Sequence, residues 1–137
     1  YVRFTPVPAA FGGSWDAFAR AYLAADILGV AKRSHRAMFD AIHEKQTVPT
    51  QNVAPEELAT FYANYGISQQ RFIETYKSAA VDTKLKAARE FALRSKLPGT
   101  PAMIVNGRYL IQARDYPDML RVADGLIARE HTASATR

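Results

Sequence analysis

Apolar residues recur every three or four positions through most of residues 14–95, and this spacing predicts a series of amphipathic helices. Ser14, Ser68 and Ser78 precede three of the apolar stripes and are expected to be N-caps. Pro55 suits the first turn of another helix. About five helices are predicted in this region. Their buried faces are expected to include Trp15, Phe18, Ala19, Tyr22 and Leu23; His35, Met38, Phe39 and Ile42; Leu58, Phe61, Tyr62 and Tyr65; and Val81, Leu85, Ala88 and Ala92.

The beginning and the last third of the chain contain short runs of β-prone residues instead. The run Tyr1–Phe4 precedes two prolines and predicts a strand. The apolar runs at residues 102–105 and 108–111 flank Asn106-Gly107. This dipeptide favours a two-residue hairpin, because both turn positions need positive φ.

The order of elements is therefore one strand, a block of helices, a hairpin and a final helix that starts at Pro117. A single strand is not stable alone, so the first strand and the hairpin are expected to meet in one sheet, with the helices inserted between them. This order predicts an α/β fold in four segments: residues 1–12 as strand and linker, 13–96 as the helical insertion, 97–130 as loop, hairpin and C-terminal helix, and 131–137 as a frayed tail.

Composition agrees with a folded domain and excludes several kinds of site. Of the 137 residues, 48% are hydrophobic and 23% are charged, and no apolar run approaches the roughly 20 residues of a transmembrane helix. The net charge of +5 comes from Lys and Arg dispersed among acidic residues, so a nucleic-acid partner is not expected. There is no cysteine, which excludes an internal disulfide, thiol catalysis and a cysteine metal site within these residues.

The remaining polar side chains predict no metal, cofactor or catalytic site. His35 and His43 are about 80° apart around a helix, and no third ligand lies at metal-site spacing. Capping positions are expected for Ser14, Ser34, Ser68 and Ser78, and none of them has the G-x-S-x-G elbow of a hydrolase. There is no glycine-rich phosphate loop either. We therefore expect neither a cofactor nor a metal.

The most specific motif is the run Leu97–Tyr109, LPGTPAMIVNGRY, which resembles the cis-proline loop and following hairpin of DsbA-type thiol:disulfide oxidoreductases. Two weaker matches agree with it. The run Phe11–Gly13 and the helix after it resemble the entry to that family's helical insertion, and residues 37–43 resemble its next helix. The resemblance covers essentially the whole chain and implies a thioredoxin-like fold, incomplete at the N-terminus, with an all-helical insertion.

In the family that this motif resembles, the loop binds the substrate. The resemblance implies that Gly99, Thr100 and Pro101 form the substrate-binding site and that the Thr100–Pro101 bond is cis. It also implies that Thr100 pairs with an extended substrate backbone. The residues alone are equally consistent with a helix-to-strand loop that two prolines stiffen.

One departure from the family pattern limits what these residues can do. The family's Cys-x-x-Cys motif begins the helix that precedes the strand matching Tyr1–Phe4, and no residue here replaces its thiolate. The chain is therefore expected to be inactive alone. The start without methionine favours a processed or truncated chain. We expect an N-terminal segment outside these residues, or a swapped dimer, to supply the strand between residues 1–4 and 102–105.

The function implied by the resemblance is that of a periplasmic enzyme that introduces disulfides into secreted proteins. Its partners would be unfolded or reduced secreted polypeptides and a membrane redox partner that reoxidises it. Two alternatives remain: a kappa-class glutathione transferase or isomerase, with a serine nucleophile near the N-terminus, and a redox-inactive module that keeps the peptide groove. Upstream sequence distinguishes the three by a Cys-x-x-Cys motif, a lone serine or neither.

Overall fold

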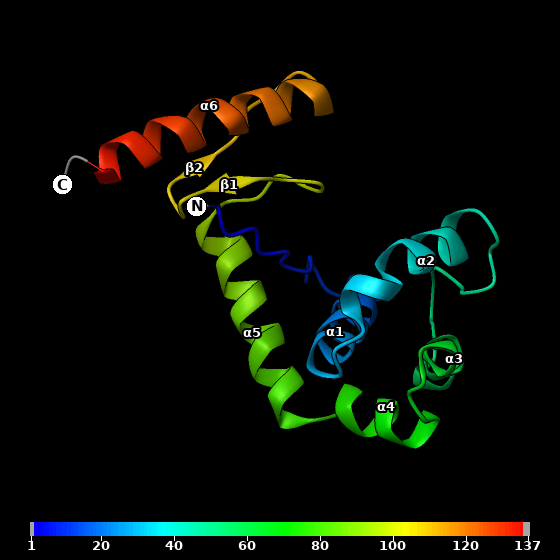
Figure 1. Ribbon diagram of the computed structural model, residues 1–137. Helices are drawn as coiled ribbons and strands as arrows, with labels where there is room; N and C mark the ends of the chain where they lie inside the picture. Colours follow the sequence, from blue (N-terminus) through cyan, green and yellow to red (C-terminus); the bar gives the residue numbers. More distant parts are fainter. Residues whose placement is uncertain (1, 136–137) are drawn as a thin grey trace. The chain divides into compact units, whose positions relative to one another are not determined.

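The computed structural model describes residues 2–135, which divide into two compact units (Figure 1). Residues 7–92 form what we call the helical unit, and residues 2–6 with 93–135 form the hairpin unit. The elements are α1 (Ser14–Ile27), α2 (Ala31–His43), α3 (Pro55–Tyr62), the 3₁₀ turn η1 (Ala63–Tyr65), α4 (Gln69–Tyr76), α5 (Ala79–Arg94), β1 (Ile104–Val105), β2 (Tyr109–Leu110) and α6 (Tyr116–Ala135).

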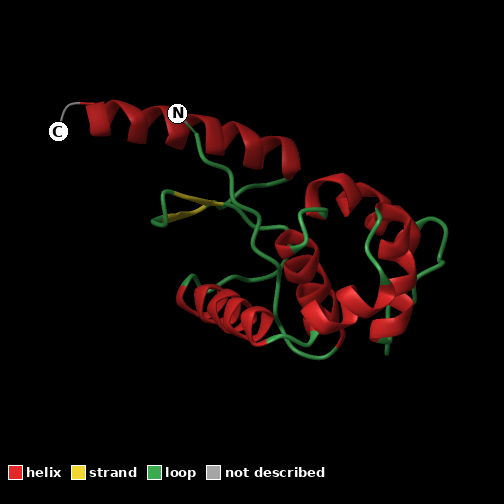
Figure 2. Cartoon of the chain, turned by 60° about the horizontal axis from the view of Figure 1, so that its bottom comes forward, coloured by secondary structure: helices red, strands yellow, loops and turns green. Residues whose placement is uncertain are grey.

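The core of the helical unit forms where α1, α3 and α4 meet, with α2 against α1. Phe72, Leu58 and Val81 are its largest fully buried apolar side chains. Figure 2 shows that helices make up nearly all the regular structure and that the strands are confined to one short hairpin.

Two of the four serines predicted at capping positions are confirmed as N-caps. The Ser68 hydroxyl accepts a hydrogen bond from the Arg71 N–H at 3.2 Å, and the Ser78 hydroxyl accepts one from the Val81 N–H at 3.3 Å. These bonds satisfy backbone donors that a first helical turn leaves without a partner.

The predictions for Ser34 and Ser14 are wrong. Ser34 lies inside α2, where its hydroxyl donates to the Val30 carbonyl at 2.7 Å. Gly13 occupies the N-cap position of α1, and the Ser14 hydroxyl instead donates to Gln51 Oε1 at 2.9 Å. The Asp16 carboxylate accepts the Gly12 N–H at 3.0 Å and so satisfies a donor at this helix start. A carboxylate also interacts favourably with the positive end of the helix dipole.

The predicted buried face of α5 is confirmed, because Val81, Leu85, Ala88 and Ala92 are its buried residues. The predicted faces of α1 and α2 are only partly right. Trp15 and Phe39 are 49% and 54% exposed, and His35 is exposed too. The buried positions are mostly small: Ala19, Ala21, Leu23, Ala24 and Ala25 on α1, and Ala31, Ser34, Met38 and Ala41 on α2.

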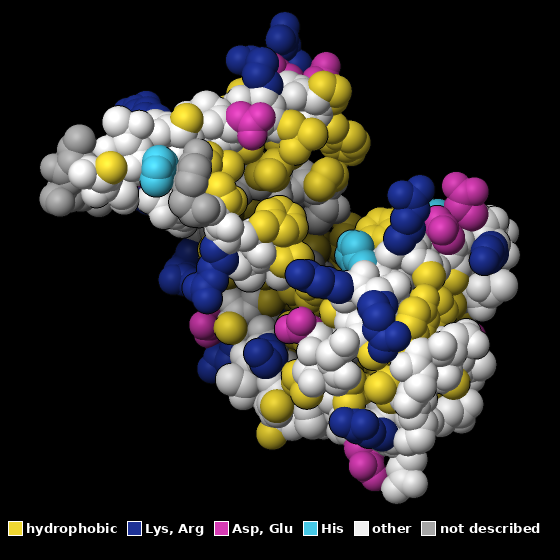
Figure 3. Space-filling view, viewed as in Figure 1, with side chains coloured by type: hydrophobic (Ala, Val, Ile, Leu, Met, Phe, Trp, Pro, Cys, Tyr) yellow, Lys and Arg dark blue, Asp and Glu magenta, His cyan; other side chains and the backbone are white. Residues whose placement is uncertain are grey.

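Small side chains allow neighbouring helices to approach closely, so alanines occupy the contacts around α1 and the large rings remain at the rim. The half-buried side chains at this rim include Phe18, Tyr22, Phe61 and Tyr65. In the space-filling view, apolar side chains reach the surface among the charged ones (Figure 3).

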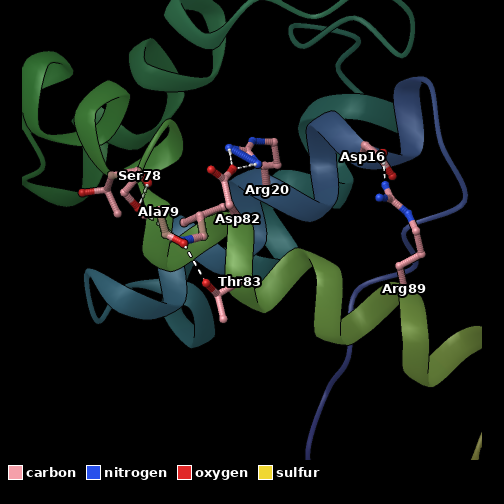
Figure 4. Close-up of polar contacts among 9 residues, drawn as sticks. Asp16, Arg20, Ser78, Ala79, Asp82, Thr83 and Arg89 are labelled. Carbon is pink, nitrogen blue, oxygen red and sulfur yellow. Dashed lines mark hydrogen bonds and ion pairs between the residues drawn. The ribbon is translucent and has the colours of Figure 1, made fainter.

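Two ion pairs join α1 to α5 (Figure 4). Arg20 donates through both terminal nitrogens to Asp82, one at 2.8 Å, and Arg89 pairs with Asp16. The earlier residue of α1 pairs with the later residue of α5, so the two helices run antiparallel along this contact. Partly exposed pairs of this kind contribute about 0–1 kcal/mol each, so they orient α5 more than they stabilise it.

The predicted turn of the hairpin is confirmed. Asn106 and Gly107 both have positive φ, 56° and 66°, and the Arg108 N–H donates to the Val105 carbonyl at 3.1 Å. The strands pair antiparallel, with Ile104 opposite Leu110, and α6 contacts β1.

Two predictions for the ends of the chain are wrong. Residues 2–4 of the predicted strand form no strand: they are exposed, Phe4 at 76%, and within the described residues no strand lies beside them to supply a ladder. Tyr1 of the predicted strand and residues 136–137 of the predicted tail lie outside the described residues. The expected fraying from His131 is also not seen, because α6 continues to Ala135. No Gly or Pro interrupts residues 131–135, and alanine is the strongest helix former.

Two glycines make a matched pair for a test of backbone conformation. Gly125 lies exposed inside α6, and a Cβ added there meets nothing within 4 Å. We expect Gly125→Ala to raise the free energy of unfolding by about 0.5–1 kcal/mol. Gly66 also has open space around it, but its φ is 81°. Gly66→Ala should therefore lower stability by about 1 kcal/mol. Urea unfolding of both variants measures the difference, and equal effects would contradict the assignment of Gly66 as a left-handed helix end.

Among residues 2–135, no helix is both long enough and apolar enough to cross a membrane.

Candidate functional site

The segment that the sequence singles out lies between α5 and β1, and we call residues 97–102 the proline loop. Helix α5 ends at Arg94, and Lys96 then adopts a left-handed conformation with φ 53°. The Lys96 N–H donates to the Leu93 carbonyl at 3.2 Å, which closes the helix end. The chain leaves the helix here and reaches β1 at Ile104.

The structure places all three predicted binding residues next to each other in this loop. Thr100 and Pro101 are exposed and Gly99 is half-buried. The Thr100–Pro101 peptide bond is cis, as the resemblance implies. A Cβ added to Gly99 meets nothing within 4 Å, so the glycine lies against open space.

The backbone groups of the proline loop have no hydrogen-bond partner among the described residues: no hydrogen bond uses the N–H or C=O of residues 97–102. The ladder of the hairpin begins one residue later, where the Ile111 N–H donates to the Met103 carbonyl at 3.1 Å. Unpaired groups beside a strand can pair with an extended peptide in the manner of an added strand.

The chemistry that the loop can supply is recognition. Its side chains are those of Leu97, Pro98, Gly99, Thr100, Pro101 and Ala102, which include no acid, base or thiol. The free N–H groups of Gly99 and Thr100 are donors, and the Thr100 carbonyl is an acceptor. The loop can therefore bind a backbone but cannot exchange a disulfide by itself.

The two histidines considered from the sequence lie elsewhere, on the exposed side of α2. The Phe39 ring lies between them, with its centroid 5.1 Å from His35 and 5.7 Å from His43. No group of three or more His, Cys, Asp or Glu within residues 2–135 could hold a metal ion. The i, i+4 spacing of the three rings on a helix is consistent with these contacts. The prediction that His35 and Phe39 face inward is wrong, because both are exposed.

One ionisable group lies in the core of the helical unit, where burial changes its titration. Burial raises the pKa of Tyr62 to about 12, against an opposing hydrogen bond from Ser34. At the start of α6, hydrogen bonds from Arg121 and Arg114 lower the pKa of the Asp118 carboxyl. Neither group belongs to the proline loop.

One charged side chain was missed entirely by the sequence reasoning. Glu130 of α6 is only 9% exposed, and it lies beside the hairpin turn. Asn106 Nδ2 donates to Glu130 Oε2 at 3.4 Å, and an Arg108 terminal nitrogen is 3.6 Å from Glu130 Oε1. The sequence feature that could have indicated its burial is its position seven residues after Ala123, on the same face of the helix.

Comparison with known proteins places this geometry in context. The sequence model of the family described as "DSBA-like thioredoxin domain" matches residues 2–123. The chain is 34% identical over 136 residues to thiol:disulfide interchange protein DsbA of Pseudomonas aeruginosa, and 37% identical over 135 residues to that of Azotobacter vinelandii. These matches cover 97% and 96% of this chain but only 63% and 62% of the relatives.

Among solved structures, the chain is similar to the crystal structure of the oxidoreductase DsbA from Xylella fastidiosa. The TM-score is 0.94 at 58% sequence identity, over 95% of this chain and 70% of that one. DsbA of Pseudomonas aeruginosa is similar as well, with a TM-score of 0.87 and 33% identity over 97% of this chain and 69% of that one.

Proposed function

The chain belongs to the DSBA-like thioredoxin domain family and has its thioredoxin-like fold, and on this premise we propose that it forms the substrate-binding part of a protein thiol:disulfide oxidoreductase. Gly99, Thr100 and Pro101 bind the backbone of the substrate polypeptide. The single observation that carries this proposal is the exposed, unpaired backbone of the proline loop beside the first pairing residues of the hairpin.

Disulfide exchange itself needs thiols that these residues do not contain. Exchange proceeds by attack of a thiolate on a disulfide sulfur, and there is no cysteine among the 137 residues. The chain spans about 63% of the length of the curated relatives it matches. The reactive cysteines of the active protein would therefore be supplied from outside the residues described here.

The substrates and partners follow from this assignment as proposals. The substrate is an unfolded or reduced secreted polypeptide, because an extended segment exposes backbone groups that can pair with the unpaired N–H and C=O groups of the proline loop. The site of action is the periplasm, where disulfides persist. A membrane redox partner would accept the electrons that each new disulfide releases.

Peptide binding tests the role of the proline loop. An extended peptide titrated into the 15N-labelled chain should shift the Gly99 and Thr100 amide resonances. Binding should weaken more on Pro101→Ala than on Pro98→Ala, because Pro101 directly follows the pairing residue. Gly99→Ala should leave stability within about 1 kcal/mol, since its Cβ would meet open space, and yet should hinder an approaching peptide.

Equal loss of affinity in the Pro98 and Pro101 variants would contradict a binding site centred on Thr100. That result would favour the alternative that residues 97–102 are only a helix-to-strand loop stiffened by two prolines.

Reduction of insulin tests the division between binding and exchange. The 137-residue chain alone should be inactive, and adding a fragment that carries the family's strand and Cys-x-x-Cys helix should restore activity. A fragment in which both cysteines are replaced by serine is the control, and it should restore nothing. Activity of the chain alone would overturn the assignment, because no thiol would be present to account for it.

A further inference from the structure

We propose that Glu130 is a positioning residue, which holds the Asn106-Gly107 turn against α6 and thereby sets the place of β1 and the proline loop. This inference rests on the proposed function of that loop. It concerns a residue more than twenty positions away along the chain from the turn that it contacts.

The contact of Glu130 with the turn joins two segments that differ in their own stability. Helix α6 is a regular helix that runs from Tyr116 to Ala135, whereas each strand of the hairpin is two residues long. An isolated two-stranded hairpin is marginally stable at best, so this one needs support from outside. The Glu130 carboxylate provides it with one oxygen near the Asn106 amide and the other near the Arg108 guanidinium.

The buried face of α6 shows that this contact is part of the packing. Ala123 and Glu130 are the two buried residues of the helix, and their spacing of seven puts both on one side. Ala123 leaves room for close approach, and Glu130 is the only buried charged side chain in residues 2–135. A buried charge costs free energy unless it is paired, and an apolar residue at the same position would give packing alone. The carboxylate adds a specific attachment point for the turn.

The turn is connected to the proline loop through a short and constrained path. Asn106 begins the turn in a left-handed conformation, Val105 and Ile104 form β1, and Met103 is tied to Ile111 by a backbone hydrogen bond. Ala102 and Pro101 come directly before these residues. A displacement of the turn relative to α6 therefore changes where the backbone of Thr100 is presented.

A set of variants in the 137-residue chain tests this inference. Glu130→Ala should weaken binding of an extended peptide by about 2- to 30-fold and shift the Thr100 and Ala102 amide resonances of the free chain. Glu130→Gln keeps an acceptor for Asn106 and should recover most of the affinity. Arg121→Ala is the matched control on the same helix: it removes an exposed ion pair with Asp118 and should change neither readout.

A double-mutant cycle separates positioning from a general loss of stability. Asn106→Gly keeps the positive φ of the turn but removes the amide that contacts Glu130. Its effect on affinity should not add to that of Glu130→Ala, because both remove the same contact. Additive effects, or Glu130→Ala with unchanged Thr100 and Ala102 resonances and unchanged affinity, would overturn the proposal.

The two proposals fail in different ways. If the unmodified chain binds no peptide, the proposed function fails, while the resonances of Thr100 and Ala102 in the free Glu130 variants still decide the positioning role. If Glu130→Ala does not fold, the comparison of Glu130→Gln with Asn106→Gly decides it: an undisturbed loop in Asn106→Gly would count against the contact.

Discussion

Replacement of Phe72 by alanine is expected to destabilise the helical unit by about 3–5 kcal/mol. Phe72 is fully buried, and its ring stacks on Tyr62 with centroids 4.8 Å apart and planes 17° from parallel. It also lies against Tyr76, at 5.9 Å. Truncation would leave a cavity between α3 and α4, and the surrounding helices can close such a cavity only partly. Urea unfolding followed by circular dichroism measures the loss.

Two other phenylalanines provide matched controls for this result. Phe61→Ala should cost about 1–3 kcal/mol, because its half-buried ring at the rim leaves less apolar surface to lose. Phe39→Ala should lie within about 0.5 kcal/mol of the unmodified chain, because more than half of its surface is exposed. A larger loss of stability at Phe61 than at Phe72 would contradict this order and would show that the Phe61 ring lies deeper in the core than its half-buried position indicates.

Raising the pH from 10 to 12 is expected to remove about 2 kcal/mol of stability through Tyr62 alone. Burial raises the pKa of this hydroxyl from 10.0 to about 12, so the folded chain keeps the proton after the unfolded chain has lost it. Ionisation then favours the unfolded state. The contribution of Tyr62 is fully present below pH 10, and it falls until the pH passes the folded value near 12.

Tyr62→Phe isolates this effect from the other groups that titrate at alkaline pH. The variant keeps the ring that stacks on Phe72, and Ser34 retains the Val30 carbonyl as an acceptor at 2.7 Å. Stability at pH 7 should therefore change by less than about 1.5 kcal/mol. The difference in unfolding free energy between variant and unmodified chain should shift in favour of the variant between pH 10 and 12. A constant difference over this range would mean that water reaches the Tyr62 hydroxyl.

The backbone conformation of the proline loop and the hairpin turn was largely predictable from the sequence. Pro98, Pro101 and the Asn106-Gly107 pair restrict their own backbone, so the loop and turn follow from residues that are adjacent in the chain. What the pattern could not predict is Glu130. Its spacing of seven from Ala123 puts it on the inward face of α6, but an acidic side chain is seldom buried unless it is paired. Only the tertiary contact with a turn more than twenty residues earlier supplies that partner.

By itself the sequence determined those features that depend on neighbours within about one helical turn. The caps at Ser68 and Ser78, the left-handed end at Gly66 and the buried stripe of α5 belong to this group. Only the tertiary structure decided which faces of α1 and α2 are buried. The alanines on these faces stabilise the fold only when another helix packs closely against them, and the sequence pattern does not show where that happens. The tertiary structure also decided the conformation of residues 2–4. β-prone residues form a strand only where a second strand pairs with their backbone, and none does so here within the described residues.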